Sequence, residues 1–382
     1  MPAATKAIRF GHLWDGKGKL WSNPVVVVEG DRVRSVGTQI PPDSEVIDLS
    51  RYTGLPGLLD VHTHLTYYWD QTPGTRPRQS TRPRPAPENA RRTLEAGVTT
   101  VRDLHASEGS DLAMRDLIDR GAMIGPRMFV STQGLIAART GKDSAAIAQA
   151  VRDRVAAGAD WIKMFGSSGG FEDVSGNPTF TLDQMRTAVD ATHAAGRRIA
   201  IHSYGPEGAR RAVLAGADSL EHAIDLDDAT LQEMARRGTF YVPTIDHNRY
   251  YAENAAPYGF APGSVERLQA FLERNVATAR RAFQAGVRFA MGSDAVYTMF
   301  GQNTRELEWF VQAGMTPEQA LRAATTNGAI LLGKEKELGA VAAGYYADLV
   351  AVEGNPLADI RAATRQVRWV MKGGSVVFNA AR

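Results

Sequence analysis

The sequence contains no cysteine among its 382 residues. Disulfide bonds and thiolate metal sites are therefore excluded, and a metal ion bound by this chain must be held by nitrogen and oxygen ligands. A strong excess of one charge is also missing, because 44 lysines and arginines stand against 42 aspartates and glutamates, for a net charge of +2. This balance gives no indication of nucleic acid or a membrane surface as a partner.

The sequence also lacks an apolar run of about 20 residues, the length that a transmembrane helix needs. It shows no signal-peptide pattern, so we expect a cytoplasmic protein unless a leader is removed during maturation. The basic residues between Arg76 and Arg92 lie in a proline-rich stretch, which predicts a solvated loop, with an anion-binding rim as the alternative.

What is present is a globular composition, with 43% hydrophobic and 23% charged residues. Short strand patterns occupy both ends of the chain, at residues 7–10, 25–29, 33–36, 46–48, 348–352, 367–371 and 375–378. Neither end alone has enough strands to bury a two-sheet core. We therefore predict a small β-sandwich domain built from residues 1–55 together with 340–382.

The central part of the chain alternates between strand and helix patterns. Eight strand candidates cover residues 58–62, 99–102, 128–131, 161–165, 199–202, 219–222, 240–243 and 289–292. Helical spacing of apolar residues falls between many of them, as at 145–157, 182–194 and 265–285. This pattern predicts an α/β fold with a (β/α)8 TIM barrel over residues 56–339, and a doubly wound open sheet is the alternative.

Two histidines separated by one residue, His62 and His64, end the first of these strand candidates. Alternate side chains of a strand share a face, so both imidazoles can bind one divalent metal ion. His202, His222 and Asp294 end other apolar runs, or follow closely. Because catalytic groups of a TIM barrel come from the carboxyl ends of its strands, this placement favours a metal-dependent hydrolase.

Five motifs occur in one order along the chain: PGLLDVHTH at 56–64, WIK at 161–163, IHS at 201–203, LEH at 220–222 and GSD at 292–294. Together they resemble the amidohydrolase superfamily, and the likeness covers nearly the whole chain. The resemblance is to the branch that contains imidazolonepropionase-like enzymes and metal-dependent, prolidase-like dipeptidases. It implies a hydrolase of carbon–nitrogen bonds that acts on a small-molecule substrate and forms a homo-oligomer.

The resemblance also implies two divalent metal ions, expected to be zinc. His62, His64 and Asp294 would bind one ion, and His202 and His222 the other. Lys163 would bridge the two ions as a carbamate formed with carbon dioxide. A buried lysine readily loses its proton, which leaves an amine that can react in this way. A Lys163 that snorkels toward solvent or pairs with a carboxylate is the alternative.

Asp294 has a second implied role in this scheme. A hydroxide that bridges the metal ions would attack the amide carbonyl, and Asp294 would take its proton and pass it to the leaving group. The favoured substrate is a dipeptide or an N-acyl amino acid with a free carboxylate. No covalent enzyme intermediate is needed.

Candidate substrate-binding residues follow the seventh strand candidate and include Tyr241, His247 and Arg249. Similarity to the dipeptidase-like branch implies that a tyrosine, His247 or Arg249 binds the substrate carboxylate, and an aromatic loop packed on its neighbours is the alternative. Tyr204 stands where many relatives carry a histidine, and we include it among the residues that affect substrate choice.

Three other functions fit parts of the pattern. A lactonase or phosphotriesterase would use the same two metal ions. A mononuclear deaminase would need no bridging lysine, so Lys163 argues against it. A non-catalytic relative that kept only the fold would have little reason to retain every type of metal ligand at its expected position.

Overall fold

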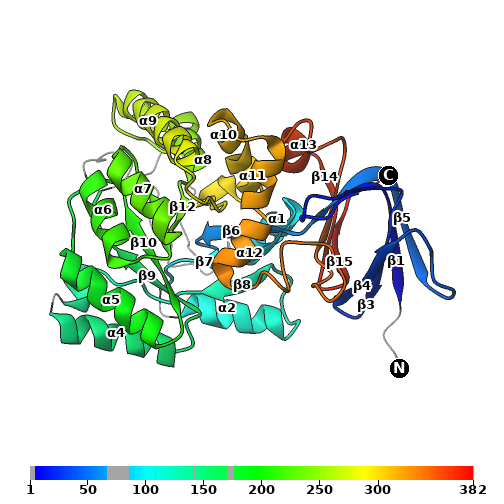
Figure 1. Ribbon diagram of the computed structural model, residues 1–382, viewed down its shortest axis with the longest axis horizontal. Coiled ribbons are helices and arrows are strands. Elements are labelled where there is room, and N and C mark those ends of the chain that lie inside the picture. Colours follow the sequence, from blue (N-terminus) through cyan, green and yellow to red (C-terminus); the bar gives the residue numbers. More distant parts are fainter. Residues whose placement is uncertain (1–4, 67–85, 108, 142, 170–175, 382) are drawn as a thin grey trace.

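The computed structural model describes residues 5–66, 86–107, 109–141, 143–169 and 176–381 (Figure 1). Strands from the two chain ends, drawn in blue and red, lie at one end of the molecule. The remaining strands lie beside them and are surrounded by helices. None of the helices in these ranges has both the length and the apolar character that a membrane crossing requires.

Both chain ends build one sheet. Its strands are β1 (Lys6–Trp14), β2 (Leu20–Ser22), β3 (Val25–Glu29), β4 (Arg32–Gly37), β5 (Glu45–Pro56), β13 (Leu349–Val352), β14 (Val367–Lys372) and β15 (Ser375–Asn379). They are ordered β15-β14-β13-β5-β1-β3-β4, and β2 pairs with β1. Phe10, Leu349 and Trp369 belong to an apolar core of this sheet. Strands of the two ends therefore pair with one another, and the β-sandwich domain of residues 1–55 and 340–382 stays a prediction.

The central strands form two parallel sheets. One contains β6 (Leu58–Thr63), β7 (Val98–Asp103) and β8 (Arg127–Val130), and the other contains β9 (Trp161–Phe165), β10 (Arg198–Ser203), β11 (Ser219–His222) and β12 (Phe240–Val242). Isolated bridges extend the second sheet at both edges, from Met164 on β9 to Leu135 and from Tyr241 on β12 to Phe289. The α/β class is confirmed. Strand pairing does not close the sheets into one, so the eight-stranded barrel stays a prediction.

Helices cover the outside of the parallel strands (Figure 1). They are α1 (Ala86–Glu95), α2 (Ser110–Asp119), α3 (Ala137–Thr140), α4 (Ser144–Ala156), α5 (Leu182–Ala194), α6 (Pro206–Ala215), α7 (Asp228–Arg237), α8 (Ile245–Asn254), α9 (Ser264–Gln284), α10 (Glu306–Gln312), α11 (Pro317–Ala323), α12 (Thr326–Leu332) and α13 (Arg361–Arg365). Local sequence explains several ends: Thr181 and Gln184 form a capping box before α5, and Gly216 ends α6 in the left-handed conformation.

Part of the predicted loop between Arg76 and Arg92 is helical. Arg91 and Arg92 lie on α1, where both form ion pairs of 2.7 Å with Glu88. These side chains are three and four residues from Glu88 and therefore meet on one helix face. The loop prediction is wrong for residues 86–92, and residues 76–85 lie outside the described residues.

Side chains of the parallel strands point alternately inward and outward. One apolar cluster, on the inner side of the strands, contains Leu59, Val61, Trp161, Ala200, Val242 and Ala290. Their neighbours along the strands pack in the layer that includes the helices, namely Leu58, Ile162, Ile199 and Tyr241. On β9 and β10 this alternation places Lys163 and His202 on the same inward face as Trp161 and Ala200.

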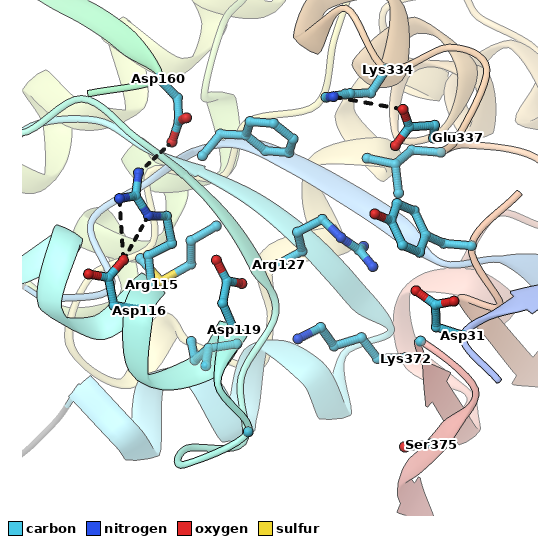
Figure 2. Close-up of a pocket in the computed structure, with 17 residues that line it drawn as sticks. Asp31, Arg115, Asp116, Asp119, Arg127, Asp160, Lys334, Glu337, Lys372 and Ser375 are labelled. Carbon is cyan, nitrogen blue, oxygen red and sulfur yellow. Dashed lines mark hydrogen bonds and ion pairs between the residues drawn. The ribbon is translucent and has the colours of Figure 1, made fainter. Parts of the chain in front are cut away.

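A cleft of about 850 Å³ separates the terminal sheet from the amino ends of the parallel strands (Figure 2). Asp31 and Ser375 line it from the terminal sheet, and Arg127 and Asp160 line it from the starts of β8 and β9. Arg127 forms an ion pair of 2.7 Å with Asp348 there.

Gly57 joins β5 directly to β6 and brings the two strand systems into contact. A Cβ atom at this position would lie 2.2 Å from Thr99 Oγ1 and 2.8 Å from Asp348 Cβ. We expect Gly57→Ala to lower the free energy of unfolding by about 1–3 kcal/mol through overpacking. Urea unfolding measures this change. Gly37→Ala is the matched control, since nothing lies within 4 Å of its added Cβ; equal stability of the two variants would contradict the close contact.

Candidate active site

The four predicted metal-binding histidines gather at the carboxyl ends of the parallel strands. His62 lies on β6 with His64 directly after it, His202 lies on β10, and His222 ends β11. Ring centroids are 5.4 Å apart for His62 and His64, 4.8 Å for His62 and His222, and 4.6 Å for His202 and His222. All four rings are buried, with at most 8% of any residue exposed.

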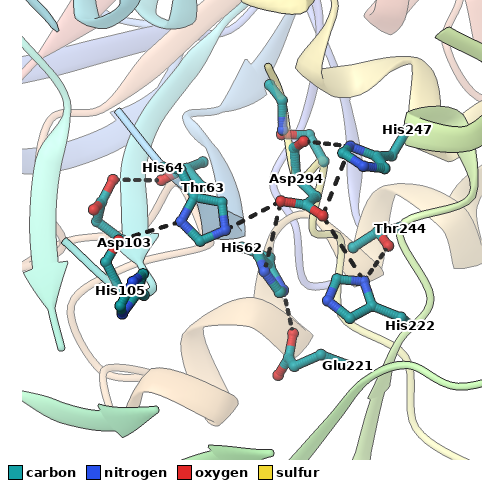
Figure 3. A network of polar contacts seen from close by, with 12 residues as sticks. His62, Thr63, His64, Asp103, His105, Glu221, His222, Thr244, His247 and Asp294 are labelled. Atoms are coloured by element: carbon teal, nitrogen blue, oxygen red, sulfur yellow. Dashed lines mark hydrogen bonds and ion pairs between the residues drawn. The ribbon is translucent and has the colours of Figure 1, made fainter. Parts of the chain in front are cut away.

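The Asp294 carboxylate lies among these rings, as Figure 3 shows. Its Oδ1 is 3.2 Å from His64 Nε2 and 3.8 Å from His62 Nε2, and its Oδ2 is 3.9 Å from His222 Nδ1. Burial alone would raise the pKa of Asp294, but the neighbouring His247, His62 and His64 rings outweigh it and hold this pKa well below its usual range. The carboxyl group is therefore ionised.

Strained backbone directs several of these side chains. Positive φ angles occur at His222 (71°) and Asp294 (49°), and also at Thr244 (51°), which follows β12. Non-glycine residues seldom adopt this conformation, and it persists where surrounding contacts determine it. Here the Asp294 N–H donates to the His62 carbonyl over 2.8 Å, and the His222 Nδ1 lies 2.7 Å from Thr244 Oγ1.

Lys163 lies on β9 with 1% of its surface exposed. Burial lowers its pKa to about 8, although Glu221 and Asp294 act in the opposite direction. Both carboxylates therefore influence this amine, and the carbamate and the carboxylate-paired lysine both stay predictions. Burial and the nearby Lys163 also lower the pKa of His62 to about 4, which leaves a neutral imidazole, the form that binds metals.

The residues at this site fit a divalent cation. His62, His222 and Asp294 each offer one ligand atom, and these atoms all lie within 4.8 Å of one another. The Nε2 atom of His62 is buried and has no hydrogen-bond partner in the described ranges. Buried polar atoms normally have a partner, and a bound metal ion would supply one for this nitrogen. Imidazole nitrogen and carboxylate oxygen are donors that zinc accepts.

Glu221, which was not predicted as a site residue, is completely buried beside His62. Its Oε2 accepts a hydrogen bond of 2.6 Å from His62 Nδ1, and its Oε1 lies 2.9 Å from Arg102 Nη2. Burial would raise the pKa of Glu221, but Arg102 and His62 outweigh it and hold this pKa at about 2. A glutamate inside an apolar strand pattern was the available signal, since a carboxylate is seldom buried without partners.

Two of the predicted substrate-binding residues border the cluster. The Tyr204 ring stacks on His222 with centroids 5.1 Å apart and meets the His202 ring edge-on at 4.9 Å. His247, on α8, places its Nδ1 2.7 Å from the Asp294 carbonyl oxygen and 3.6 Å from Asp294 Oδ2. Both side chains are therefore positioned beside proposed metal ligands.

The structure does not bring Tyr241 to the cluster. Its side chain points into the outer layer, where its hydroxyl donates to the Ala223 carbonyl and its ring packs on Phe289. The alternation of side chains along β12 causes this placement, because Val242 takes the inward position. A contact between Tyr241 and a substrate at the histidines would require this packing to change.

Arg249 is engaged with acidic neighbours on α8. Its guanidinium forms a bidentate pair with Asp246, at 2.7 and 2.8 Å, and a further ion pair with Glu253. These partners are three and four residues away, and their contacts depend on a helix where the sequence predicted a loop. The pairing leaves little of the guanidinium for a substrate carboxylate.

Comparison with known proteins agrees with this site. Residues 53–377 match the Amidohydrolase family. Ochratoxinase of Aspergillus niger is 27% identical over 423 residues, covering 98% of this chain and 87% of that protein. Imidazolonepropionase of Streptomyces coelicolor is 27% identical over 367 residues, covering 86% of this chain and 85% of that protein.

The chain also resembles a solved structure of a Xaa-Pro dipeptidase with methionine bound in its active site. The TM-score is 0.88 at 31% identity, and the match covers 98% of this chain and 99% of that one. The branch predicted from the motifs is therefore confirmed. The chain belongs to the amidohydrolase family and is a hydrolase that acts on carbon–nitrogen bonds of small molecules.

Proposed function

We propose that the protein cleaves the amide bond of a small substrate with a free carboxylate, such as a dipeptide or an N-acyl amino acid. The observation that carries this proposal is the convergence of His62, His222 and Asp294, whose ligand atoms lie within 4.8 Å of one another. The similarity to a Xaa-Pro dipeptidase supports a dipeptide as substrate.

The proposal includes two divalent metal ions, expected to be zinc. His62, His64 and Asp294 would hold one ion, and His202 and His222 the other. When bound, the ions would polarise the amide carbonyl and lower the pKa of water. Lys163 would bridge them after its amine adds to carbon dioxide and loses a proton, and the lowered pKa of this buried amine supports that step.

Asp294 would act as the proton shuttle. Its carboxyl group is ionised, so it can accept a proton from the attacking water molecule and deliver it to the leaving amine nitrogen. The surrounding imidazoles keep this carboxylate in place, and its backbone is fixed by the hydrogen bond to the His62 carbonyl.

We assign recognition of the substrate carboxylate to His247. Its Nδ1 donates to the Asp294 carbonyl oxygen, so the doubly protonated ring, an imidazolium, would present an Nε2–H to a substrate carboxylate. Arg249 is less suited because Asp246 and Glu253 already neutralise it. Tyr204 would border the same substrate through its contacts with His202 and His222.

The proposal also covers the architecture around the site. We infer that residues 56–339 close into a (β/α)8 barrel through the segments at Leu135 and Phe289, and that residues 1–55 and 340–382 form the β-sandwich. Backbone hydrogen bonds support this closure, among them one of 2.8 Å from the Val61 N–H to the Met291 carbonyl. A homo-oligomer is expected from the resemblance.

We expect nearly two divalent metal ions per chain and release of a free amino acid from dipeptides or N-acyl amino acids. Elemental analysis of protein never exposed to a chelator, together with amino-acid analysis of the products, measures both. Two metal ions without amide cleavage would redirect the search to lactones and phosphotriesters. One ion or none would contradict the bridging role of Lys163.

Replacement of Lys163 by alanine should remove the bridge and lower both metal content and activity. A short carboxylic acid such as acetate should restore part of both, because its two oxygens can replace those of the carbamate. Lys334→Ala is the control, since Lys334 lies at the cleft of Figure 2 and pairs with Glu337. A Lys163→Ala variant that works equally well with and without acetate would refute the carbamate.

The role of His247 is tested by His247→Ala on a dipeptide and on its uncharged C-terminal amide. Loss of a hydrogen bond to a charged group costs about 1.5–3 kcal/mol, so KM for the dipeptide should rise about 10- to 100-fold. KM for the amide should change much less. Arg249→Ala serves as the comparison, and a selective KM effect there instead would transfer the role to Arg249.

A further inference from the structure

Behind His62 lie two buried residues, Arg102 and Glu221, that the proposed reaction does not use. Arg102 comes from β7, Glu221 from β11 and His62 from β6, and all three residues are 0% exposed. Arg102 Nη2 donates to Glu221 Oε1 over 2.9 Å, and His62 Nδ1 donates to Glu221 Oε2 over 2.6 Å. Figure 3 shows Glu221 on the side of His62 opposite to Asp294.

The Arg102 guanidinium is held on every side. Its Nε donates to the Val61 carbonyl over 2.6 Å, and its Nη1 donates to Ser219 Oγ over 3.0 Å. Its central carbon lies 4.4 Å from the centre of the Trp161 ring, an arrangement typical of a cation–π contact. Together with the Nη2 contact to Glu221, these hydrogen bonds use all three guanidinium nitrogens, so the planar group has one fixed orientation.

The fixed guanidinium in turn fixes Glu221. Its Oε1 accepts from Arg102 and from the Ser219 hydroxyl, and its Oε2 accepts from His62. Both carboxylate oxygens are therefore engaged and directed away from the ion site. The donated proton sits on His62 Nδ1, which leaves Nε2 as the ring atom that points toward Asp294 Oδ1 at 3.8 Å.

We propose that Arg102 and Glu221 are positioning residues that set the metal affinity of the site through the tautomer and ring orientation of His62. Neither residue would touch the ion or the substrate. The inference rests on the proposed function only in that the site binds a divalent cation. A histidine ligand commonly donates its second ring N–H to a carboxylate, and loss of such an outer partner typically weakens metal binding about 10- to 100-fold.

Arg102 is needed in this arrangement because it holds the carboxylate on the far side of the ring. Without it, Glu221 Oε1 would keep only the Ser219 hydroxyl, and the carboxylate could rotate toward the cation. We therefore expect loss of Arg102 to change the ligand geometry as well as the affinity. Arg102→Lys keeps the charge, but its ammonium donates from a single atom and lacks the planar set of donors that reaches Val61, Ser219 and Glu221, so it should recover only part of the affinity.

The experiment measures Zn²⁺ affinity of the full chain by competition with a chelator of known affinity. Arg102→Met, Glu221→Gln and the double variant should each bind Zn²⁺ about 10- to 100-fold more weakly. The double variant removes both buried charges together, so it avoids the unpaired buried charge that can prevent folding of a single variant. Visible absorption of the Co²⁺-loaded chain should also change, since it reports ligand geometry.

Arg127→Met is the matched control. Arg127 pairs with Asp348 at 2.7 Å and lies 3.8 Å from the centre of the Tyr346 ring, so it has the same kinds of partner as Arg102. It sits in the cleft of Figure 2, at the start of β8 and away from the histidines. Its loss should leave Zn²⁺ affinity and the Co²⁺ spectrum unchanged.

The outcomes separate this proposal from the proposed function. A folded double variant with unchanged Zn²⁺ affinity would overturn the positioning role, as would an equal loss in Arg127→Met. Absence of Zn²⁺ binding by the unchanged chain would overturn it as well. Weaker binding in the Arg102 and Glu221 variants, combined with no amide cleavage by the unchanged chain, would support the positioning role and contradict the proposed substrate.

Discussion

Charged groups that are buried away from water need ion-pair or hydrogen-bond partners within the protein, and this requirement determines the arrangement of side chains at the centre of the molecule. An unpaired charge in the interior costs several kcal/mol, so each buried ion needs fixed partners. Arg102 and Glu221 meet this need across β7 and β11. Asp60 on β6 meets it differently, since its oxygens accept from the Ser293 N–H and hydroxyl and from Asn303 Nδ2. These contacts join segments that are distant in the sequence.

The histidine cluster depends on this framework. Asp60 binds the segment that carries Asp294, and Glu221 binds His62, so two proposed ligands are held from behind by carboxylates. Positive φ angles at His222 and Asp294 are tolerated because these contacts fix the backbone around them. Contacts within the protein therefore hold these proposed ligands in position.

Much of this arrangement could be predicted from the sequence, because apolar runs that end in polar residues mark the carboxyl ends of buried strands. The predicted strands at 161–165 and 219–222 coincide with β9 and β11, and they placed Lys163 and His222 correctly on those strands. The eighth candidate, 289–292, forms an isolated bridge at Phe289 instead of a strand. An apolar pattern indicates a buried segment but does not distinguish regular strand pairing from a single bridge.

Pairings between side chains could not be predicted in the same way. Arg249 looked available for a substrate because Asp246 and Glu253 become its neighbours only once residues 245–254 form a helix. Tyr241 looked close to the site because a strand end was assigned without knowing which face is inward. Glu221 was overlooked because its partners, Arg102 and His62, lie far away in the sequence and meet it only in the folded chain.

The order of strands in the terminal sheet has a consequence for synthesis on the ribosome. β5 pairs with β1 on one edge and with β13 on the other, where Pro56 stands opposite Leu349. At roughly 5–20 residues per second, β13 follows β5 out of the ribosome by roughly 15–60 s. During that interval the nascent sheet presents an open edge that can pair with another chain. All of the chain from β6 to α12 must be made, and can begin to fold, before the terminal sheet is complete.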